Sequence, residues 1–259
     1  MPRNLIATRY VTPLREGGSL PAVVEADDEG LYVMKFRGAG QGRKALIAEI
    51  VAGELARKLQ LPIPEIVLVE LDADMARTEP DPEIQHLIRA SAGLNLALDY
   101  LPGSVNYDPL VDRPDPELAS RIVWFDAFVA NVDRTARNTN MLLWHRRLNL
   151  IDHGAALYFH HDWANAANAA SGRFAPIKDH VLLPLASEIA LIDADMAGRI
   201  APELVDSIVQ LLPESWLADE PGFADAEQHR RAYADYLNRR VQSPRAFVEE
   251  AIHARSLQL

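Results

Sequence analysis

The chain contains no cysteine among its 259 residues. Disulfide bonds, thiol nucleophiles and thiolate-ligated metal sites are therefore excluded, and any chemistry must use oxygen and nitrogen groups. Cationic residues are also scarce, because 26 Lys and Arg face 37 Asp and Glu, which gives a net charge of -11. No basic stripe interleaved with aromatic residues offsets this acidic balance, so we expect no nucleic-acid partner.

Long apolar runs are absent as well. No stretch approaches the roughly 18 to 20 apolar residues that a membrane span requires, and the first residues lack the apolar core of a signal peptide. The sequence therefore predicts a cytoplasmic protein without a membrane span. Its content of 49% hydrophobic and 24% charged residues is typical of a globular chain that can bury a full core.

Residues 1–101 are predicted to form one lobe, an antiparallel sheet with one helix. Short apolar and β-branched segments separated by glycine and aspartate turns are typical of an antiparallel meander. A helix is expected over residues 44–59, where apolar residues recur at a spacing of four, and a loop with a short helix around residues 83–90 is expected after it. The expected strands cover residues 5–14, 20–25, 31–36, 66–71 and 94–100.

Residues 102–259 are predicted to form a second, mostly helical lobe, because Leu101-Pro102-Gly103-Ser104 breaks the preceding pattern. Asp115 and Pro116 read as an N-cap and first residue of a helix that extends to Val129. A hairpin should follow over residues 140–151. Further helices are expected near residues 184–191, 193–200, 202–212 and 224–256.

The most informative motif follows the helix that ends near Val129. Asp133 and Asn138 are five residues apart, and Asp152 stands directly after the predicted hairpin. One carboxylate that positions a hydroxyl, with an amide and a second carboxylate that hold a metal, is what magnesium-dependent phosphoryl transfer requires. Asn140 is an alternative amide ligand. The Asp-x4-Asn spacing is common by chance, and the helix, hairpin and Ile-Asp-His-Gly around it make it specific.

Lys35 ends an apolar strand, and the helix after it carries Glu49 and Glu54. A strand lysine can hold nucleotide phosphates if a helix carboxylate fixes its ammonium group. We expect Glu49 to do this, because it lies nearer the helix start. The plainer interpretation is a lysine that extends into water, beside two ordinary surface acids.

Gly17, Gly18 and Ser19 join the two strands that precede the lysine strand. We expect this turn to cover the phosphates, although two adjacent glycines also make an ordinary hairpin turn. The later Gly38, Gly40 and Gly42 do not have the spacing of a Walker loop or a dinucleotide fingerprint, so they read as a connection.

Other polar residues near the motif have weaker signals. His160, His161 and Asp162 lack the ligand spacing of a zinc site with His153, so a solvated loop is the expectation there. Ser171 reads as a plain loop serine rather than a phosphorylated one. Arg134 and Arg137 flank the motif and either neutralise transferred phosphate or pair with surface acids.

Together these residues resemble the HipA-like kinases, relatives of the type II phosphatidylinositol 4-kinases. The resemblance rests on Asn131-x-Asp133-Arg134-x3-Asn138, Asp152-His153-Gly154, the Lys35 strand and the helix that ends before Leu61-Pro62-Ile63-Pro64, and it extends over roughly residues 10–215. It implies an α+β fold of two lobes like that of the protein kinases. The chain is shorter than the toxin members of the family, and we expect no separate subdomain before its first strands.

The resemblance implies a role for each site residue. Asp133 would be the catalytic base, and Asn138 and Asp152 the ligands of Mg2+. Lys35 would bind the phosphates of ATP, and residues Asp99, Tyr100 and Leu101 would form the hinge that faces adenine. The implied activity is that of a serine/threonine protein kinase.

Two other functions stay open at this stage. A small-molecule or lipid-headgroup kinase would use the same loop on a different hydroxyl acceptor. A catalytically silent nucleotide-binding module would keep the fold without the chemistry, although all the required side chains are present.

Overall fold

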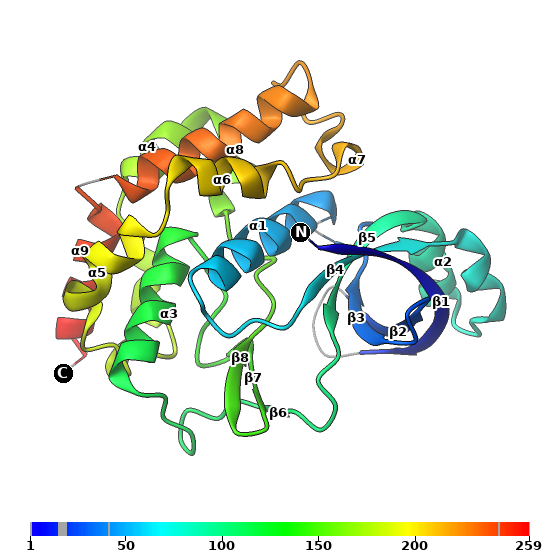
Figure 1. Ribbon diagram of the computed structural model, residues 1–259, viewed down its shortest axis with the longest axis horizontal. Helices are drawn as coiled ribbons and strands as arrows, with labels where there is room; N and C mark the ends of the chain where they lie inside the picture. The colour runs from blue at the N-terminus through cyan, green and yellow to red at the C-terminus, as the bar shows by residue number, and fades with distance from the viewer. Residues whose placement is uncertain (1, 15–19, 41, 243, 259) are drawn as a thin grey trace.

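A closed barrel of five strands forms the first part of the protein (Figure 1). The computed structural model describes residues 2–14, 20–40, 42–242 and 244–258. Neighbouring strands follow the order β1-β2-β3-β5-β4, and β4 pairs with β1 to close the barrel. The strands are β1 (Arg3–Pro13), β2 (Ala22–Ala26), β3 (Leu31–Lys35), β4 (Ile66–Leu71) and β5 (Gly93–Asp99).

The prediction of a purely antiparallel sheet is wrong for one pair of strands, β1 and β4. The meander β1-β2-β3 is antiparallel, but β1 pairs with β4 in parallel, with Arg3 opposite Val67 and Ile6 opposite Glu70. The long strand β1 pairs with both neighbours: its first residues pair with β4 and its remaining residues pair with β2. Local sequence patterns identify strands but contain no information on this distant pairing. Closure leaves the barrel without an unpaired edge strand.

The short helix predicted around residues 83–90 is confirmed, in addition to the helix predicted over residues 44–59. Besides α1 (Gly42–Lys58), the barrel is accompanied by α2 (Pro82–Ala90) and by the 3-10 helix η1 (Ala73–Thr78). Asp81 caps α2 by accepting a hydrogen bond from the Glu83 amide at 2.9 Å. Ile84, Leu87 and Ile88 of α2 are buried with the residues that fill the barrel.

Strand alternation decides where Lys35 points. Tyr32 and Met34 are buried among the residues that fill the barrel, whereas Lys35, one residue further, faces the other side of β3. The same alternation places Ile66 and Leu68 of β4 on the outer face, in the core that α1 shares with the helical part. The lysine therefore points away from the barrel interior, toward α1 and the rest of the chain.

Helix α1 is wedged between the barrel and the helical part of the protein (Figure 1). It contacts β4 and β5 on one side and α6 (Pro202–Val209) and α7 (Glu214–Leu217) on the other. All of its residues from 46 to 56 are buried. The expected amphipathic helix is therefore buried nearly all round, and Glu49 and Glu54 are not surface acids.

The second part begins with α3 (Pro116–Phe128) and a three-stranded sheet, β6 (Val105–Asn106), β7 (Met141–Trp144) and β8 (Arg147–Leu150). Strands β7 and β8 are the predicted hairpin. No helix among the residues described is long and apolar enough to cross a bilayer. The remaining helices are η2 (Tyr158–His161), η3 (Trp163–Asn165), α4 (Ala166–Ser171), η4 (Ala175–Asp179), η5 (Leu183–Leu185), α5 (Ile189–Gly198), α6, α7, α8 (Ala226–Val241) and α9 (Ala246–Ser256).

The long helix predicted over residues 224–256 is divided into α8 and α9. Pro244 lies between them and has no amide hydrogen to donate to a continuous helix. The break lets α9 turn and pack against α3 and α5. Proline is therefore the physical reason for the difference.

The end of α3 sets the position of the loop that follows. Asp115 caps the start of the helix by accepting a hydrogen bond from the Leu118 amide at 2.8 Å. At the other end Ala130 has a left-handed φ of 53°, and the Asn131 amide donates to the Asp126 carbonyl at 2.9 Å. This is the hydrogen bond of a Schellman-type helix end, which here uses alanine where glycine is usual. It turns the chain directly into the segment that contains Asp133.

Arg240, on α8, binds the carbonyl oxygens at the end of α3. Its guanidinium group is buried and donates to the carbonyl oxygens of Phe128 at 2.6 Å, Ala127 at 2.7 Å and Ala169 at 2.8 Å. The carbonyls at the end of α3 have no partner within the helix, so the cation satisfies them and also binds the end of α4.

We expect Arg240→Met to lower the free energy of unfolding by about 3 kcal/mol, because buried carbonyls would lose their donor. Arg239→Met is the matched control, since this neighbouring side chain is exposed, and we expect a change within about 0.5 kcal/mol. Urea unfolding followed by circular dichroism measures both. Equal effects of the two substitutions would contradict this role of Arg240.

Candidate active site

Lys35 joins three separate segments of the chain. Its Nζ lies 2.7 Å from Oε2 of Glu49 on α1 and 2.5 Å from Oδ1 of Asp152, in the loop after β8. Burial alone would lower the pKa of Lys35, but the two carboxylates outweigh it and hold that pKa above its ordinary value. Glu54 instead pairs with Arg57 at 2.8 Å, so Glu49 is the helix carboxylate that meets the lysine.

Asp152 reaches this contact through an uncommon backbone conformation. Its φ is 56°, in the left-handed region that few residues other than glycine adopt and that occurs often at functional sites. The side chain remains 44% exposed, so one face of the carboxylate is open to a ligand. The charge of Lys35 holds the pKa of Asp152 below its ordinary value, which keeps the carboxylate ionised at neutral pH.

Asp133 lies in a loop that orients it through amide groups. Asn138 Nδ2 donates to Asp133 Oδ2 at 2.7 Å, and Asn140 Nδ2 donates to the same oxygen at 3.3 Å. The Asp133 amide in turn donates to Asn131 Oδ1 at 3.2 Å. The two amides considered as metal ligands therefore both meet Asp133, and Asn138 is the exposed one.

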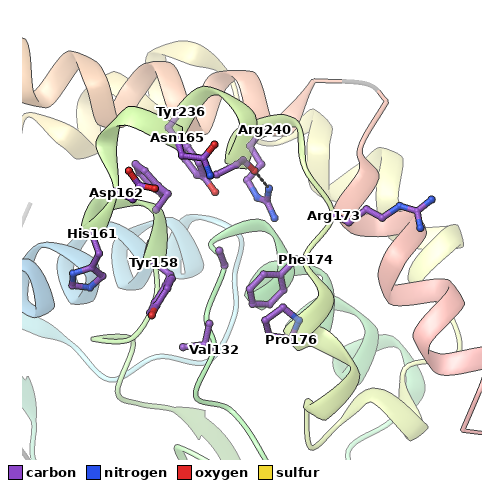
Figure 2. Close-up of a pocket in the computed structure, with 13 residues that line it drawn as sticks. Val132, Tyr158, His161, Asp162, Asn165, Arg173, Phe174, Pro176, Tyr236 and Arg240 are labelled. Atoms are coloured by element: carbon purple, nitrogen blue, oxygen red, sulfur yellow. Dashed lines mark hydrogen bonds between the residues drawn. The ribbon is translucent and has the colours of Figure 1, made fainter.

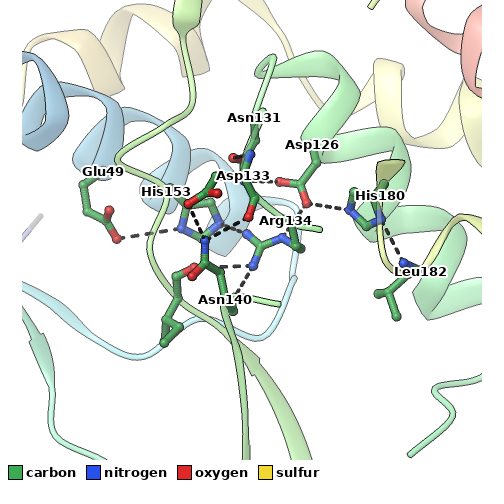
Figure 3. A network of polar contacts seen from close by, with 10 residues as sticks. Glu49, Asp126, Asn131, Asp133, Arg134, Asn140, His153, His180 and Leu182 are labelled. Atoms are coloured by element: carbon green, nitrogen blue, oxygen red, sulfur yellow. Dashed lines mark hydrogen bonds and ion pairs between the residues drawn. The ribbon is translucent and has the colours of Figure 1, made fainter. Parts of the chain in front are cut away.

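The buried side chain of Arg134 holds the two loops together (Figure 3). Its NH1 donates to the carbonyl oxygens of Asn140 at 2.5 Å and Ile151 at 3.4 Å. Its NH2 lies 3.1 Å from His153 Nε2. Because Arg134 directly follows Asp133, while Ile151 and His153 flank Asp152, these contacts bring both carboxylates to one region.

Asp126 on α3 supplies the negative charge for Arg134. Its Oδ2 accepts from Arg134 Nε at 2.5 Å and from His180 Nε2 at 2.9 Å, and its Oδ1 accepts from Asn131 Nδ2 at 3.0 Å (Figure 3). The Leu182 amide donates to His180 Nδ1 at 3.0 Å, so the proton of this imidazole lies on Nε2. Burial alone would raise the pKa of Asp126, but Arg134 and His180 outweigh it and hold that pKa well below its ordinary value.

The structure places the other predicted site residues as follows. Gly17, Gly18 and Ser19 lie outside the described residues. Asp99 ends β5 opposite Tyr32, and burial raises its pKa. The Tyr100 amide donates to the Leu31 carbonyl at 3.0 Å, and Leu101 is buried where the chain leaves the barrel.

Two sequence-based interpretations are wrong. Arg134 neither faces a site for transferred phosphate nor pairs with a surface acid, because it is buried against Asp126. His160 is not in a solvated loop either; it is buried, its Nδ1 lies 3.1 Å from the Tyr233 hydroxyl, and burial lowers its pKa to about 3.

Asp126 was missed in the sequence analysis, although a carboxylate among the aromatic residues of one helix was a usable signal.

A cavity of about 560 Å³ lies beside the loop that contains Asp133 (Figure 2). Its wall includes Val132, the residue directly before Asp133, together with Tyr158, Phe174 and Tyr236. Buried Arg240 closes one side and is held there by backbone carbonyls. The cavity has the size that is usual for ligand pockets, and its lining combines apolar and aromatic side chains with a few polar ones.

We expect Asp126→Asn to lower the free energy of unfolding at pH 7 by about 3 to 5 kcal/mol, because it leaves the buried Arg134 cation without a counter-charge. The folded-state pKa is depressed, so the carboxylate stabilises the protein above about pH 4 and this contribution is lost as the pH falls. The wild type should therefore lose more stability than the variant between pH 7 and pH 3 in urea titrations. Asp195→Asn, which removes an exposed pair with Arg199, is the control and should cost at most about 1 kcal/mol. A similarly small cost for Asp126→Asn would contradict this role.

Comparison with known proteins agrees with this geometry. A family model described as HipA-like kinase matches residues 8–248. The match covers most of the chain, and the protein therefore belongs to the HipA-like kinase family, which supports a kinase-type phosphotransferase. No match to the chain is found among the curated proteins.

A solved kinase structure has a similar fold. The Helicobacter pylori proinflammatory kinase CtkA is 13% identical with a TM-score of 0.54, and the alignment covers 100% of this chain and 99% of that one. The Golgi casein kinase is 11% identical with a TM-score of 0.49, over 97% of this chain and 72% of that one. The first likeness supports the predicted kinase-like α+β fold.

Proposed function

We propose that the protein is an ATP- and Mg2+-dependent kinase that transfers a phosphoryl group to a serine or threonine hydroxyl of a protein. The observation that carries the proposal is the pair of contacts made by Lys35, with Glu49 at 2.7 Å and Asp152 at 2.5 Å. A lysine fixed by a helix carboxylate beside a metal-binding aspartate is the arrangement that kinases use for nucleotide phosphates. Family membership supports the same chemistry.

In this proposal the nucleotide lies between residues 1–101, which act as the N-lobe, and residues 102–259, which act as the C-lobe. Lys35 binds the phosphates, and Glu49 keeps its ammonium group in place. The turn of Gly17, Gly18 and Ser19 covers the phosphates, and Asp99, Tyr100 and Leu101 face adenine.

The donor set suits magnesium. Asn138 and Asp152 offer an amide oxygen and an ionised carboxylate, and both side chains are accessible. Mg2+ prefers such oxygen ligands and usually keeps several water molecules. When bound, the ion would neutralise charge on the phosphates during transfer.

Asp133 would orient the acceptor hydroxyl and take up its proton. The hydroxyl oxygen forms the new bond to the γ-phosphorus, the bond from that phosphorus to the β,γ-bridging oxygen breaks, and ADP leaves. The side-chain amides of Asn138 and Asn140 both donate to Oδ2 of Asp133, and these hydrogen bonds fix the orientation of the carboxylate toward the acceptor hydroxyl. Positioned proton transfer of this kind contributes about 10²-fold to 10⁴-fold to rates.

We expect Asp133→Asn to lower phosphoryl transfer at least about 100-fold but to retain binding of Mg2+ with ATP. Asp152→Asn should lose both, since it would remove a metal ligand. Asp179→Asn, an exposed control, should change neither. Calorimetry with Mg2+ and ATP measures binding, and release of ADP or labelled phosphate measures turnover. Unchanged turnover in either site variant would refute the assignment.

A second candidate is a small-molecule or lipid-headgroup kinase. The cavity beside Val132 favours keeping it, because about 560 Å³ is within the range of small-molecule sites. Incubation with labelled ATP and separated cell fractions distinguishes the acceptors. Label in the protein fraction supports the first proposal, label only in the low-molecular-weight or lipid fraction supports the second, and nucleotide binding without any transfer supports a silent module.

We expect the cavity beside Val132 to hold part of the acceptor, whichever class it belongs to. Ala169→Phe would fill the cavity, so it should raise KM for the labelled acceptor at least about tenfold and leave the affinity for Mg2+ with ATP unchanged. Ala194→Phe, at an exposed position of α5, is the matched control and should change neither quantity. An unchanged KM in a folded Ala169→Phe protein would show that the acceptor binds elsewhere.

A further inference from the structure

We propose that His153 is a positioning residue that connects Glu49 on α1 with Arg134 in the loop of Asp133. Its meaning for catalysis rests on the proposed function, because that function gives Lys35 and Asp133 their roles. The connection itself is a property of the side chains in this chain. From the sequence, His153 was considered as a possible zinc ligand and as part of the Asp152-His153-Gly154 motif, without a role of its own.

His153 is fully buried between the two halves of the site. Its ring meets Phe125 edge-on at 6.1 Å, and its Nε2 lies 3.1 Å from NH2 of Arg134. Figure 3 shows the imidazole between the Glu49 carboxylate and the Arg134 guanidinium. The ring therefore has one nitrogen for each half of the site.

The contact with Arg134 determines which nitrogen has the proton. An arginine side chain only donates hydrogen bonds, so Nε2 must offer its lone pair. A neutral imidazole then has its hydrogen on Nδ1. That N–H lies on the side of the ring that faces Glu49.

The contact between His153 and Glu49 is slightly longer than a hydrogen bond. His153 Nδ1 lies 3.9 Å from Glu49 Oε1, just beyond hydrogen-bond distance. Both atoms are buried, and among the described residues neither has another hydrogen-bond partner. Glu49 uses its second oxygen for Lys35. A shift of α1 by about 1 Å would complete the hydrogen bond.

The result is a series of polar side chains from Lys35 through Glu49, His153 and Arg134 to Asp126, in which only the 3.9 Å step from Glu49 to His153 is longer than a hydrogen bond. Helix α1 and the loop of Asp133 come from parts of the chain far apart in the sequence. A hydrocarbon ring at position 153 could fill the same space but could not tie the two together. His153 therefore acts on the reaction through Glu49, by fixing the carboxylate that fixes Lys35.

The first test replaces the imidazole in the full-length protein. His153→Phe keeps a ring without either nitrogen and should lower kcat/KM for ATP about tenfold or more, as loss of a residue that orients a binding group does in other sites. His153→Gln can still donate and accept, so it should retain more than half of the wild-type value. His229→Phe, a buried histidine that accompanies other aromatic rings outside the site, is the control and should change the value less than twofold. Equal loss in the Phe and Gln variants would overturn the proposal.

A double-mutant cycle separates this role from a merely structural one. If His153 acts through Glu49, His153→Phe should weaken binding of Mg2+ with ATP about tenfold in the wild type but less than twofold in Glu49→Gln. Additive losses, measured by calorimetry, would overturn the proposal. Wild-type protein that binds no nucleotide would instead refute the proposed function.

Nitrogen-15 spectra of the histidines give a test that needs no nucleotide. The proposal predicts a neutral His153 with its hydrogen on Nδ1, assigned by the loss of its signal in His153→Gln. A hydrogen on Nε2 would overturn the connection to Arg134, even in a protein that is an active kinase. The two failures are therefore distinguishable.

Discussion

The buried ion pair between Arg134 and Asp126 is the constraint on which the rest of the site depends. Burying two charges is costly, and their attraction compensates only when the remaining donors and acceptors also have partners. Here they do, because Asp126 accepts from Asn131, Arg134 and His180, while Arg134 also donates to the carbonyls of the hairpin. The pair therefore fixes the loop of Asp133 against the segment of Asp152 rather than simply adding stability.

A second ion pair relates this fixed region to the barrel. Lys35 projects from the outer face of β3 and meets Glu49 and Asp152, which belong to α1 and to the loop after β8. Helix α1 is buried on both sides, so Glu49 cannot leave the contact without disturbing the packing of the whole helix. The barrel and the helical part are thus connected at the point where a nucleotide would be bound.

Much of the local structure could be predicted from sequence. Strand β4 agrees with its predicted range, and α3 and the hairpin of β7 and β8 lie where periodicity and capping residues indicated. These elements depend on short-range patterns. The parallel pairing of β1 with β4 depends on residues more than sixty positions apart, and no local pattern encodes it. The division of α8 from α9 was available from Pro244 and was overlooked.

The candidate site was predictable only in part for the same reason. Asp133, Asn138, Asp152 and Lys35 were proposed from the sequence because kinases use these residue types at this spacing. The surroundings that orient them, namely Asp126, His180 and the imidazole of His153, follow from burial, which a motif does not reveal. Glu49 shows the difference well, since its partner was anticipated but its complete burial was not.

Crystals grown with Mn2+ and a non-hydrolysable ATP analogue would give the decisive measurement, because manganese scatters anomalously and can occupy oxygen-ligand sites of magnesium. We predict an anomalous peak within coordination distance of Asn138 and Asp152, with the phosphates against Lys35. A nucleotide bound elsewhere, or a peak away from both side chains, would contradict the assignment of this site to phosphoryl transfer.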